Sequence, residues 1–159
     1  MTSASLTLRL PQFRPRARRY HSKALAELRR ITAQPGYRPN AYPLPSEANA
    51  SLPERALVEI RLSLPVGTYV WGFSGSSSHA AGFETQLVDL RDNSPYFTAP
   101  VGWSNITGQG STPEGLSTPL FVLPQPRLVI EPAVLKVQIK NLATATNLVQ
   151  LVIFTAEPA

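Results

Sequence analysis

The stretch VWGFSGSSSHAAGF, residues 70–83, holds the residue types that nucleophilic catalysis uses: several serines and a histidine in a glycine-rich segment. A nucleophile elbow has the pattern G-x-S-x-G between a buried strand and a helix. Here Ser76 occupies the place of the second glycine in GFSGS. His79 follows Ser78 directly, and neighbours on one turn do not hold a nucleophile, its base and an orienting group in attack geometry. We therefore predict a loop that connects two strands, and no catalytic residue.

Metal and cofactor chemistry has few candidates in this chain. The absence of cysteine excludes disulfides, thiolate zinc sites and cysteine nucleophiles. The two histidines, His21 and His79, are far apart in the sequence, and no phosphate-cradling glycine motif is present. Asp89 and Asp92 flank a turn, where such residues more commonly cap the backbone than bind a hard cation. We expect no metal, no cofactor and no enzymatic activity.

Basic residues concentrate at the N-terminal end. Residues 1–50 contain nine basic and two acidic residues, a net charge of +7, whereas residues 51–159 contain six and eight, a net charge of −2. Guanidinium groups bind carboxylates and phosphates, so this segment is a protein tether, a nucleic-acid-binding element or a solvated tail. We favour the tether. The residues expected to contact a partner are Arg14, Arg16, Arg18, Arg19, Tyr20, Lys23, Arg29, Arg30, Tyr37 and Tyr42.

One short helix is predicted, near residues 17–32. Its apolar side chains recur at spacings of three or four residues: Tyr20, Ala24, Leu28 and Ile31. The segment from there to Pro53 is rich in proline, which ends helices and is excluded from central strands. We expect it to run extended across a surface. The N-terminal arginines follow an apolar patch that Pro11 interrupts, so we expect no secretion signal. No apolar run approaches the roughly 18 residues of a membrane span, so we expect no membrane partner.

The remainder of the chain has the pattern of a β protein. Apolar and polar residues alternate strictly in 56–64 and 134–141, as in half-buried strands. Short strands separated by turn signals, with no second helix, predict an antiparallel β-sandwich of jelly-roll or related type. The pattern leaves strand order open, and with it an immunoglobulin-like alternative. The expected strands are 56–64, 68–73, 83–90, 96–100, 120–123, 127–131, 134–141 and 147–155. We divide the chain into an N-terminal arm, residues 1–55, and a sandwich domain, residues 56–159.

Two tryptophans are candidates for contact surfaces. Trp71 lies within an expected strand, which favours at least partial burial. Trp103 lies in the long loop of glycine, serine, threonine and proline at 101–119, and is the better candidate for surface contact with a partner or a carbohydrate.

Four stretches of the sandwich resemble a class of virion proteins from tailed phages. The shared features are a strand ending in Leu-Pro-x-Gly-x-Tyr/Phe-x-Trp-Gly, a serine-rich turn, a strand ending near an aspartate, a proline-rich strand with an arginine, and a closing hairpin. The stretches are LPVGTYVWGFSGSSS (64–78), FETQLVDL (83–90), LPQPRLVIEPAVLKVQIKN (123–141) and NLVQLVIFTAEP (147–158). The resemblance spans roughly residues 57–158 and leaves the arm unexplained.

The resemblance implies a jelly-roll sandwich located in the virion. Proteins of this class decorate and cement the capsid surface, or serve in the neck and tail. The partners it implies are the major capsid protein and other copies of this chain. Binding of nucleic acid by the arm stays open as an alternative.

Overall fold

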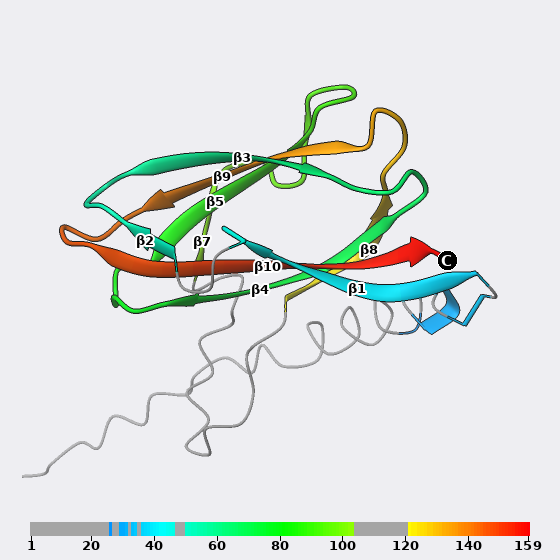
Figure 1. Cartoon of the computed structure of the whole chain (residues 1–159), viewed down its shortest axis with the longest axis horizontal. Coiled ribbons are helices and arrows are strands. Elements are labelled where there is room, and N and C mark those ends of the chain that lie inside the picture. Colours follow the sequence, from blue (N-terminus) through cyan, green and yellow to red (C-terminus); the bar gives the residue numbers. More distant parts are fainter. Residues whose placement is uncertain (1–25, 27–28, 32, 35, 47–49, 104–120) are drawn as a thin grey trace, which may run out of the picture.

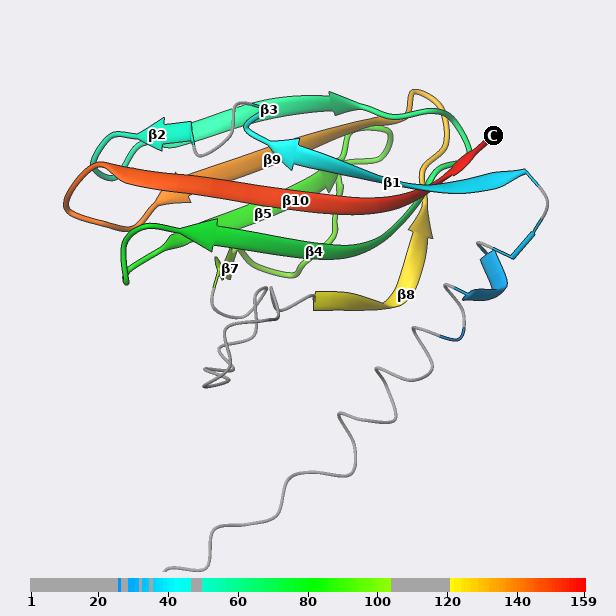
Figure 2. The ribbon, with the colours of Figure 1, turned by 60° about the horizontal axis from the view of Figure 1, so that its bottom comes forward.

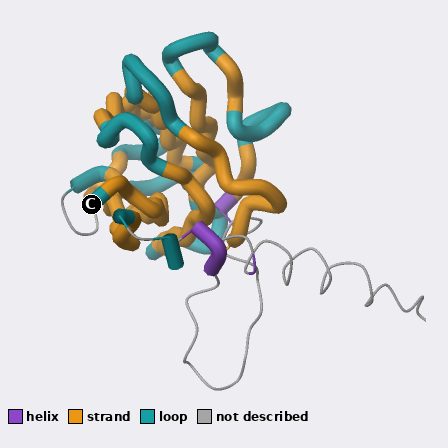
Figure 3. The backbone as a smooth tube through the Cα atoms, turned by 90° about the vertical axis from the view of Figure 1, so that its right-hand side faces the viewer, coloured by secondary structure: helices purple, strands orange, loops and turns teal. Residues whose placement is uncertain are grey.

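The computed structural model describes residues 26, 29–31, 33–34, 36–46, 50–103 and 121–159. Strands make up most of this part of the chain, and helix is limited to short pieces (Figure 3). The predicted helix is present at Ala26 and at 29–31, and its residues 17–25 lie outside the described residues.

The strands form two antiparallel sheets that face each other (Figures 1 and 2). The first sheet has the order β1 (Tyr37–Leu44), β10 (Asn147–Pro158), β4 (Tyr69–Ser77) and β8 (Phe121–Leu128), with β2 (Ala50–Leu52) also paired to β10. The second has the order β3 (Leu57–Ser63), β9 (Val134–Asn141), β5 (Phe83–Asp89) and β6 (Ser94–Pro95), with β7 (Val101–Gly102) also paired to β5. The predicted all-β sandwich is confirmed at this level.

Period-two patterning explains which side chains form the core. Leu135, Val137 and Ile139 of β9 are fully buried between the sheets, while the lysines that alternate with them lie on the outer face. The first sheet contributes its own inward row, which includes Leu151 and Ile153 of β10. Burial of these apolar side chains supplies the main favourable term in folding.

The proline-rich segment is the edge strand of the first sheet. β1 pairs with β10 over its whole length, from Tyr37 opposite Pro158 to Leu44 opposite Leu151, and β2 continues along the same edge. Both strands therefore belong to the sandwich, although their residues lie within the segment 1–55 that was expected to form the N-terminal arm. The expectation of an extended chain at a surface is confirmed.

The prolines of β1 do not interrupt this pairing. The Ala159 N–H donates to the Gly36 carbonyl at 2.6 Å. Because alternate residues of an antiparallel strand bond to the same neighbour, even-numbered residues of β1 bond to β10. Pro39 and Pro43, at odd positions, then face the free edge, where a missing N–H leaves no sheet bond unmade.

Several predicted strand boundaries are wrong. β4 continues through the serines to Ser77, so the loop before β5 covers only residues 78–82. Residues 96–100 are bends rather than a strand, and short β6 and β7 flank them. The two strands predicted around Pro124 and Pro126 are one strand, β8, which tolerates both because it lies at the edge of its sheet.

Candidate functional site

The serine-rich turn is held by hydrogen bonds to a buried asparagine. The Asn147 Oδ1 atom accepts from the Ser77 hydroxyl at 3.0 Å, the Ser78 hydroxyl at 3.1 Å and the His79 N–H at 3.1 Å. The Nδ1 atom of His79 accepts from the Ala81 N–H at 3.1 Å. These contacts use Ser77, Ser78 and His79 to shape the turn. The predicted connecting loop is present at residues 78–82 only, because Ser74, Ser76 and Ser77 belong to β4.

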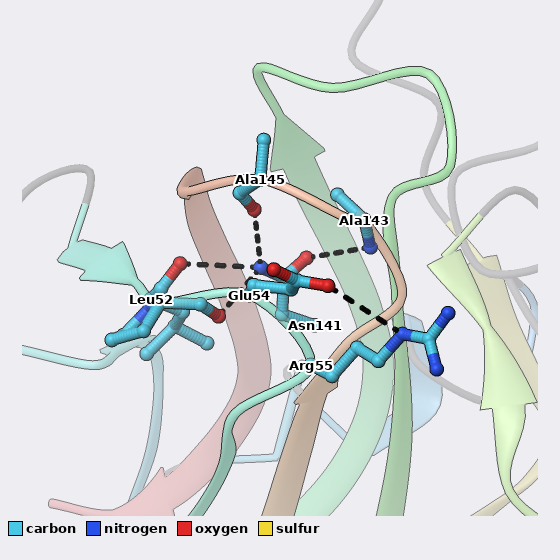
Figure 4. A network of polar contacts seen from close by, with 7 residues as sticks. Leu52, Glu54, Arg55, Asn141, Ala143 and Ala145 are labelled. Atoms are coloured by element: carbon cyan, nitrogen blue, oxygen red, sulfur yellow. Dashed lines mark hydrogen bonds and ion pairs between the residues drawn. The ribbon is translucent and has the colours of Figure 1, made fainter.

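Asn147 is one half of a pair of buried amides. Its Nδ2 atom donates to the Gly82 carbonyl at 3.1 Å and to Asn141 Oδ1 at 3.2 Å. Asn141 Nδ2 lies within hydrogen-bond distance of three carbonyls, those of Leu52 at 3.2 Å, Pro53 at 2.8 Å and Ala145 at 3.0 Å (Figure 4). Asn141 Oδ1 also accepts from the Ala143 N–H at 2.9 Å (Figure 4).

The two asparagines together fasten one end of the sandwich. Both side chains are fully buried, and their bonds reach the turns that follow β2, β4 and β9. Buried amides are costly unless all their donors and acceptors are used. Here the donors and acceptors of both side chains are used, so the Asn141–Asn147 pair holds the turns at this end of the sandwich together. Period two places Asn141 and Asn147 on the inward rows of β9 and β10, so the sequence already indicates that both side chains are buried.

A buried carboxylate lies at the opposite end of β10. Glu157 is 2% exposed and accepts from Asn40 Nδ2 at 3.2 Å to both of its oxygens, from Thr155 Oγ1 at 3.1 Å and from the Tyr42 hydroxyl. Its donors are all neutral. Burial, and then the hydrogen bond to this carboxylate, raise the pKa of Tyr42 to about 12. A phenol with this pKa is a poor general acid or base near neutral pH, so the cluster stabilises the β1–β10 junction.

The turn between β5 and β6 is capped by aspartates, as predicted. Asp89 Oδ1 accepts from the Arg91 N–H at 2.9 Å, and Asp92 Oδ1 accepts from the Ser94 N–H at 3.0 Å. The hydrogen bonds from Ser94 lower the pKa of the Asp92 carboxyl. No group of three or more His, Cys, Asp or Glu side chains in the described part of the chain is placed to hold a metal ion.

A second tyrosine lies beside this turn. The Arg127 guanidinium lies over the Tyr96 ring at 4.6 Å and donates to the Pro95 carbonyl at 2.9 Å. Burial, and then the nearby Asp89, raise the pKa of Tyr96 above its usual range. These contacts attach β8 to the loop after β6, and so join the two sheets at the end of the molecule where the aspartate-capped turn lies.

The predicted partner-binding residues are divided between several environments. Arg14, Arg16, Arg18, Arg19, Tyr20 and Lys23 lie outside the described residues. Arg29 and Arg30 are exposed, just ahead of β1. Tyr37 and Tyr42 are both half-buried in the sandwich: the Tyr37 ring lies 5.7 Å from that of Tyr69, and the Tyr42 side chain packs against the core. Their partner-binding role stays a prediction.

Trp103 packs on the sandwich at the end of the described part of its loop. The side chain is half-buried against the core, and its indole lies over Gly82, where a Cβ atom would come within 1.6 Å of the ring. The close approach requires glycine at position 82, which also has a positive φ of 66°. Only the outer part of the indole is left for a surface contact, which stays a prediction.

The outer face of the second sheet is a flat ladder of charged and polar side chains. Lys140 Nζ lies 3.1 Å from Glu84 Oε1, and Gln138 Nε2 donates to Glu59 Oε2 at 3.1 Å. A shallow cavity of about 170 Å³ lies on this face, between Leu57 and Pro100. Its volume is below the roughly 300–1,000 Å³ of typical small-molecule pockets, and one atom of its lining, the buried Gln86 Oε1, has no hydrogen-bond partner among the described residues.

In comparisons with known proteins, no family model, curated protein or solved structure matches this chain. Among the described residues, no helix is long and apolar enough to cross a membrane. The geometry therefore defines the class only as far as an antiparallel β-sandwich.

Proposed function

We propose that this chain is a non-enzymatic structural protein of a virion, a capsid decoration or cement protein that binds the lattice of the major capsid protein. The observation that carries the proposal is the joining of a segment of net charge +7 to a sandwich of net charge −2. The basic segment enters the sandwich through Tyr37, at the end of an edge strand paired along its whole length. Such a segment reaches a neighbouring subunit and adds contact area that the sandwich alone lacks.

We propose further that the sandwich is a jelly roll, which has eight strands in two sheets. With β1 and β2 counted as one edge strand and β6 and β7 as another, the chain supplies eight strand positions. These follow the order 1-8-3-6 in the first sheet and 2-7-4-5 in the second. This interleaving supports the jelly-roll topology, which viral capsid proteins use and which lectins share. The resemblance of residues 57–158 to phage virion proteins is the second support.

A lattice explains how a modest contact becomes effective. One chain binds weakly through a basic segment that salt screens. Many copies on a repeating surface, or linked to one another, gain from effective concentration without any new contact. In this proposal the arm supplies charge attraction and the sandwich supplies a rigid, inert body.

The first experiment measures particle binding by a truncated chain. Deletion of residues 1–25 removes six of the nine basic residues of 1–50 and retains Ile31, which is buried, and all of β1. Deleting residues 1–50 would instead destroy the edge strand. We expect the truncated sandwich to fold, by circular dichroism and thermal melting, and to lose binding to particles that lack this protein.

A full-length control separates charge from length. Changing Arg14, Arg16, Arg18, Arg19 and Lys23 to glutamine keeps the chain length and removes five positive charges. We expect it to lose binding as the truncation does. Full binding by a folded truncated chain overturns the tether. If the wild type binds naked DNA and does not bind particles, the basic segment binds nucleic acid and the tether proposal is wrong.

Copy number tests the location. Quantitative mass spectrometry of purified particles should find one copy of this chain per one to a few major capsid subunits. About a dozen copies per particle would place the protein in the neck or tail, and absence from particles would remove the virion proposal.

A further inference from the structure

β3 differs from the other edges of the two sheets. The first sheet ends in β1, with Pro39 and Pro43, and in β8, with two more prolines. The other edge of the second sheet is formed by β6 and β7, which are two residues long. Proline and short length are the usual means by which edges are kept from pairing with another chain. β3 is seven residues long and contains no proline.

Within the described part of the chain, the backbone groups of β3 that have no partner strand are those of its odd-numbered residues. The Asn141 N–H donates to the Ala56 carbonyl at 2.9 Å and the Leu64 N–H to the Ala133 carbonyl at 2.9 Å. Because alternate residues of an antiparallel strand bond to the same neighbour, the even-numbered residues of β3 bond to β9. Residues 57, 59, 61 and 63 therefore direct their N–H and C=O groups to the open edge.

The same four residues are exposed on the outer face. Leu57 is 59% exposed, and Glu59, Arg61 and Ser63 are exposed as well. The Glu59 carboxylate takes one hydrogen bond, from Gln138, on the β9 side. On the inner face, Val58 and Ile60 remain half-buried, although their row continues the core. The edge of the core is thus open where the backbone is also unpaired.

We propose that two copies of this chain associate through β3, antiparallel and about a two-fold axis at Ile60. Such an axis places Glu59 of each copy opposite Arg61 of the other, and Leu57 opposite Ser63. All of these are odd positions, so the groups that meet are those directed to the open edge, and each pair exchanges two N–H···O bonds. The contact is isologous and closes as a dimer, and the second sheet continues across both copies.

Charge fixes the register of this pairing. The nearest slips that keep odd residues opposite odd residues place Glu59 opposite itself or Arg61 opposite itself. Like charges directly opposite each other destabilise a strand pair, whereas opposite charges stabilise it. A slip of one residue turns the apolar row of one copy to solvent. Compared with these slipped registers, the pairing about Ile60 forms the backbone hydrogen bonds, keeps the apolar side chains of both copies on the inner face and places opposite charges together.

The test uses full-length chains with exchanged charges. Glu59→Arg places arginine opposite Arg61 at two symmetric sites, and Arg61→Glu places glutamate opposite Glu59. We expect each variant alone to weaken dimerisation by about 30-fold or more. An equimolar mixture restores both opposite-charge pairs, because one chain carries two arginines and the other two glutamates. Sedimentation velocity at about 100 µM measures the fraction of dimer in each variant alone and in their mixture, and compares it with that of the wild type.

Matched controls make the same charge changes away from the edge. Glu131→Arg and Arg91→Glu alter exposed residues of turns, and both should dimerise like the wild type. Thermal melting of each variant checks that the fold persists. A wild type that is monomeric at this concentration overturns the proposal, as does a mixture that fails to restore the dimer. The assay contains no particle, so its outcome is independent of the capsid proposal.

Discussion

Replacing Asn147 should destabilise the fold through the turns that this side chain connects. Its amide makes five hydrogen bonds, of 3.0 to 3.2 Å, in a fully buried position. Asn147→Ala removes all five. Asn147→Asp keeps the acceptor and the shape, but turns an oxygen toward the Gly82 carbonyl and Asn141 Oδ1 and buries a negative charge.

The expected loss of stability depends on which hydrogen bonds each partner of Asn147 keeps after the substitution. Each net hydrogen bond contributes about 1 kcal/mol, which sets an upper figure of about 5 kcal/mol for the alanine variant. Four partners keep a second contact; for example, the His79 N–H still has Ser77 Oγ at 3.2 Å, and Gly82 O still accepts from the Leu142 N–H at 3.1 Å. Only the Ser78 hydroxyl is left without an acceptor. We expect a loss of about 3 kcal/mol for alanine, and more for aspartate because of the buried charge.

Thermal and urea unfolding measure both variants. In a domain of this size, about 3 kcal/mol lowers Tm by about 6–12 °C. Ser76→Ala, an exposed change on the neighbouring strand β4, is the control and should fall within about 0.5 kcal/mol of the wild type. Hydrogen exchange should quicken first in residues 78–82. An aspartate variant more stable than the alanine variant would refute the assignment of Nδ2 as an essential donor.

The remaining predictions concern two glycines and one phenol. Gly82→Ala pushes a Cβ atom into the Trp103 indole, so it should lower the free energy of unfolding by about 2–3 kcal/mol and shift tryptophan fluorescence to the red. Gly36→Ala is the control: with a φ of 98° and open space around it, it should lower that free energy by about 1 kcal/mol and leave the fluorescence spectrum unchanged. Equal effects of the two variants would contradict the packing of Trp103 on Gly82. Because the pKa of Tyr42 is raised from 10.0 to about 12, the unfolded chain loses this proton first, and stability should fall as pH rises from about 10 to 12. Tyr42→Phe should reduce this fall in urea unfolding, with Tyr96 responsible for the remainder; an unchanged slope would contradict it.

Strand positions were predictable wherever one face is buried. Leu135, Val137 and Ile139 alternate with lysines and glutamine, so period two alone placed them in the core. The proline-rich strands were harder because proline signals a break in sequence, whereas in the sheet an edge position tolerates it. β8 was therefore divided into two strands, and β1 was separated from the sandwich to which it belongs.

The polar joints could be predicted only in part. The alternation of the sequence places Asn141, Asn147 and Glu157 in the inward-facing rows of their strands. A buried polar side chain needs hydrogen-bond partners, so the sequence indicates that each of the three has them. The partners themselves are carbonyls and hydroxyls of distant turns, such as the Leu52 carbonyl for Asn141, 89 positions away. Such pairings depend on strand order, which periodicity does not supply.

The pairing of β1 with β10 also determines how the sandwich resists a pulling force. A pull on the basic segment along the strand axis, away from Tyr37, loads the residue pairs between Tyr37 and Leu44 in shear, so they share the force. Because Pro39 and Pro43 face the open edge, they remove no bond from this set. A pull across the strand would instead break the pairs one after another, beginning at Pro158. The sandwich is therefore mechanically anisotropic, and its β1 edge is strongest along the axis of that strand.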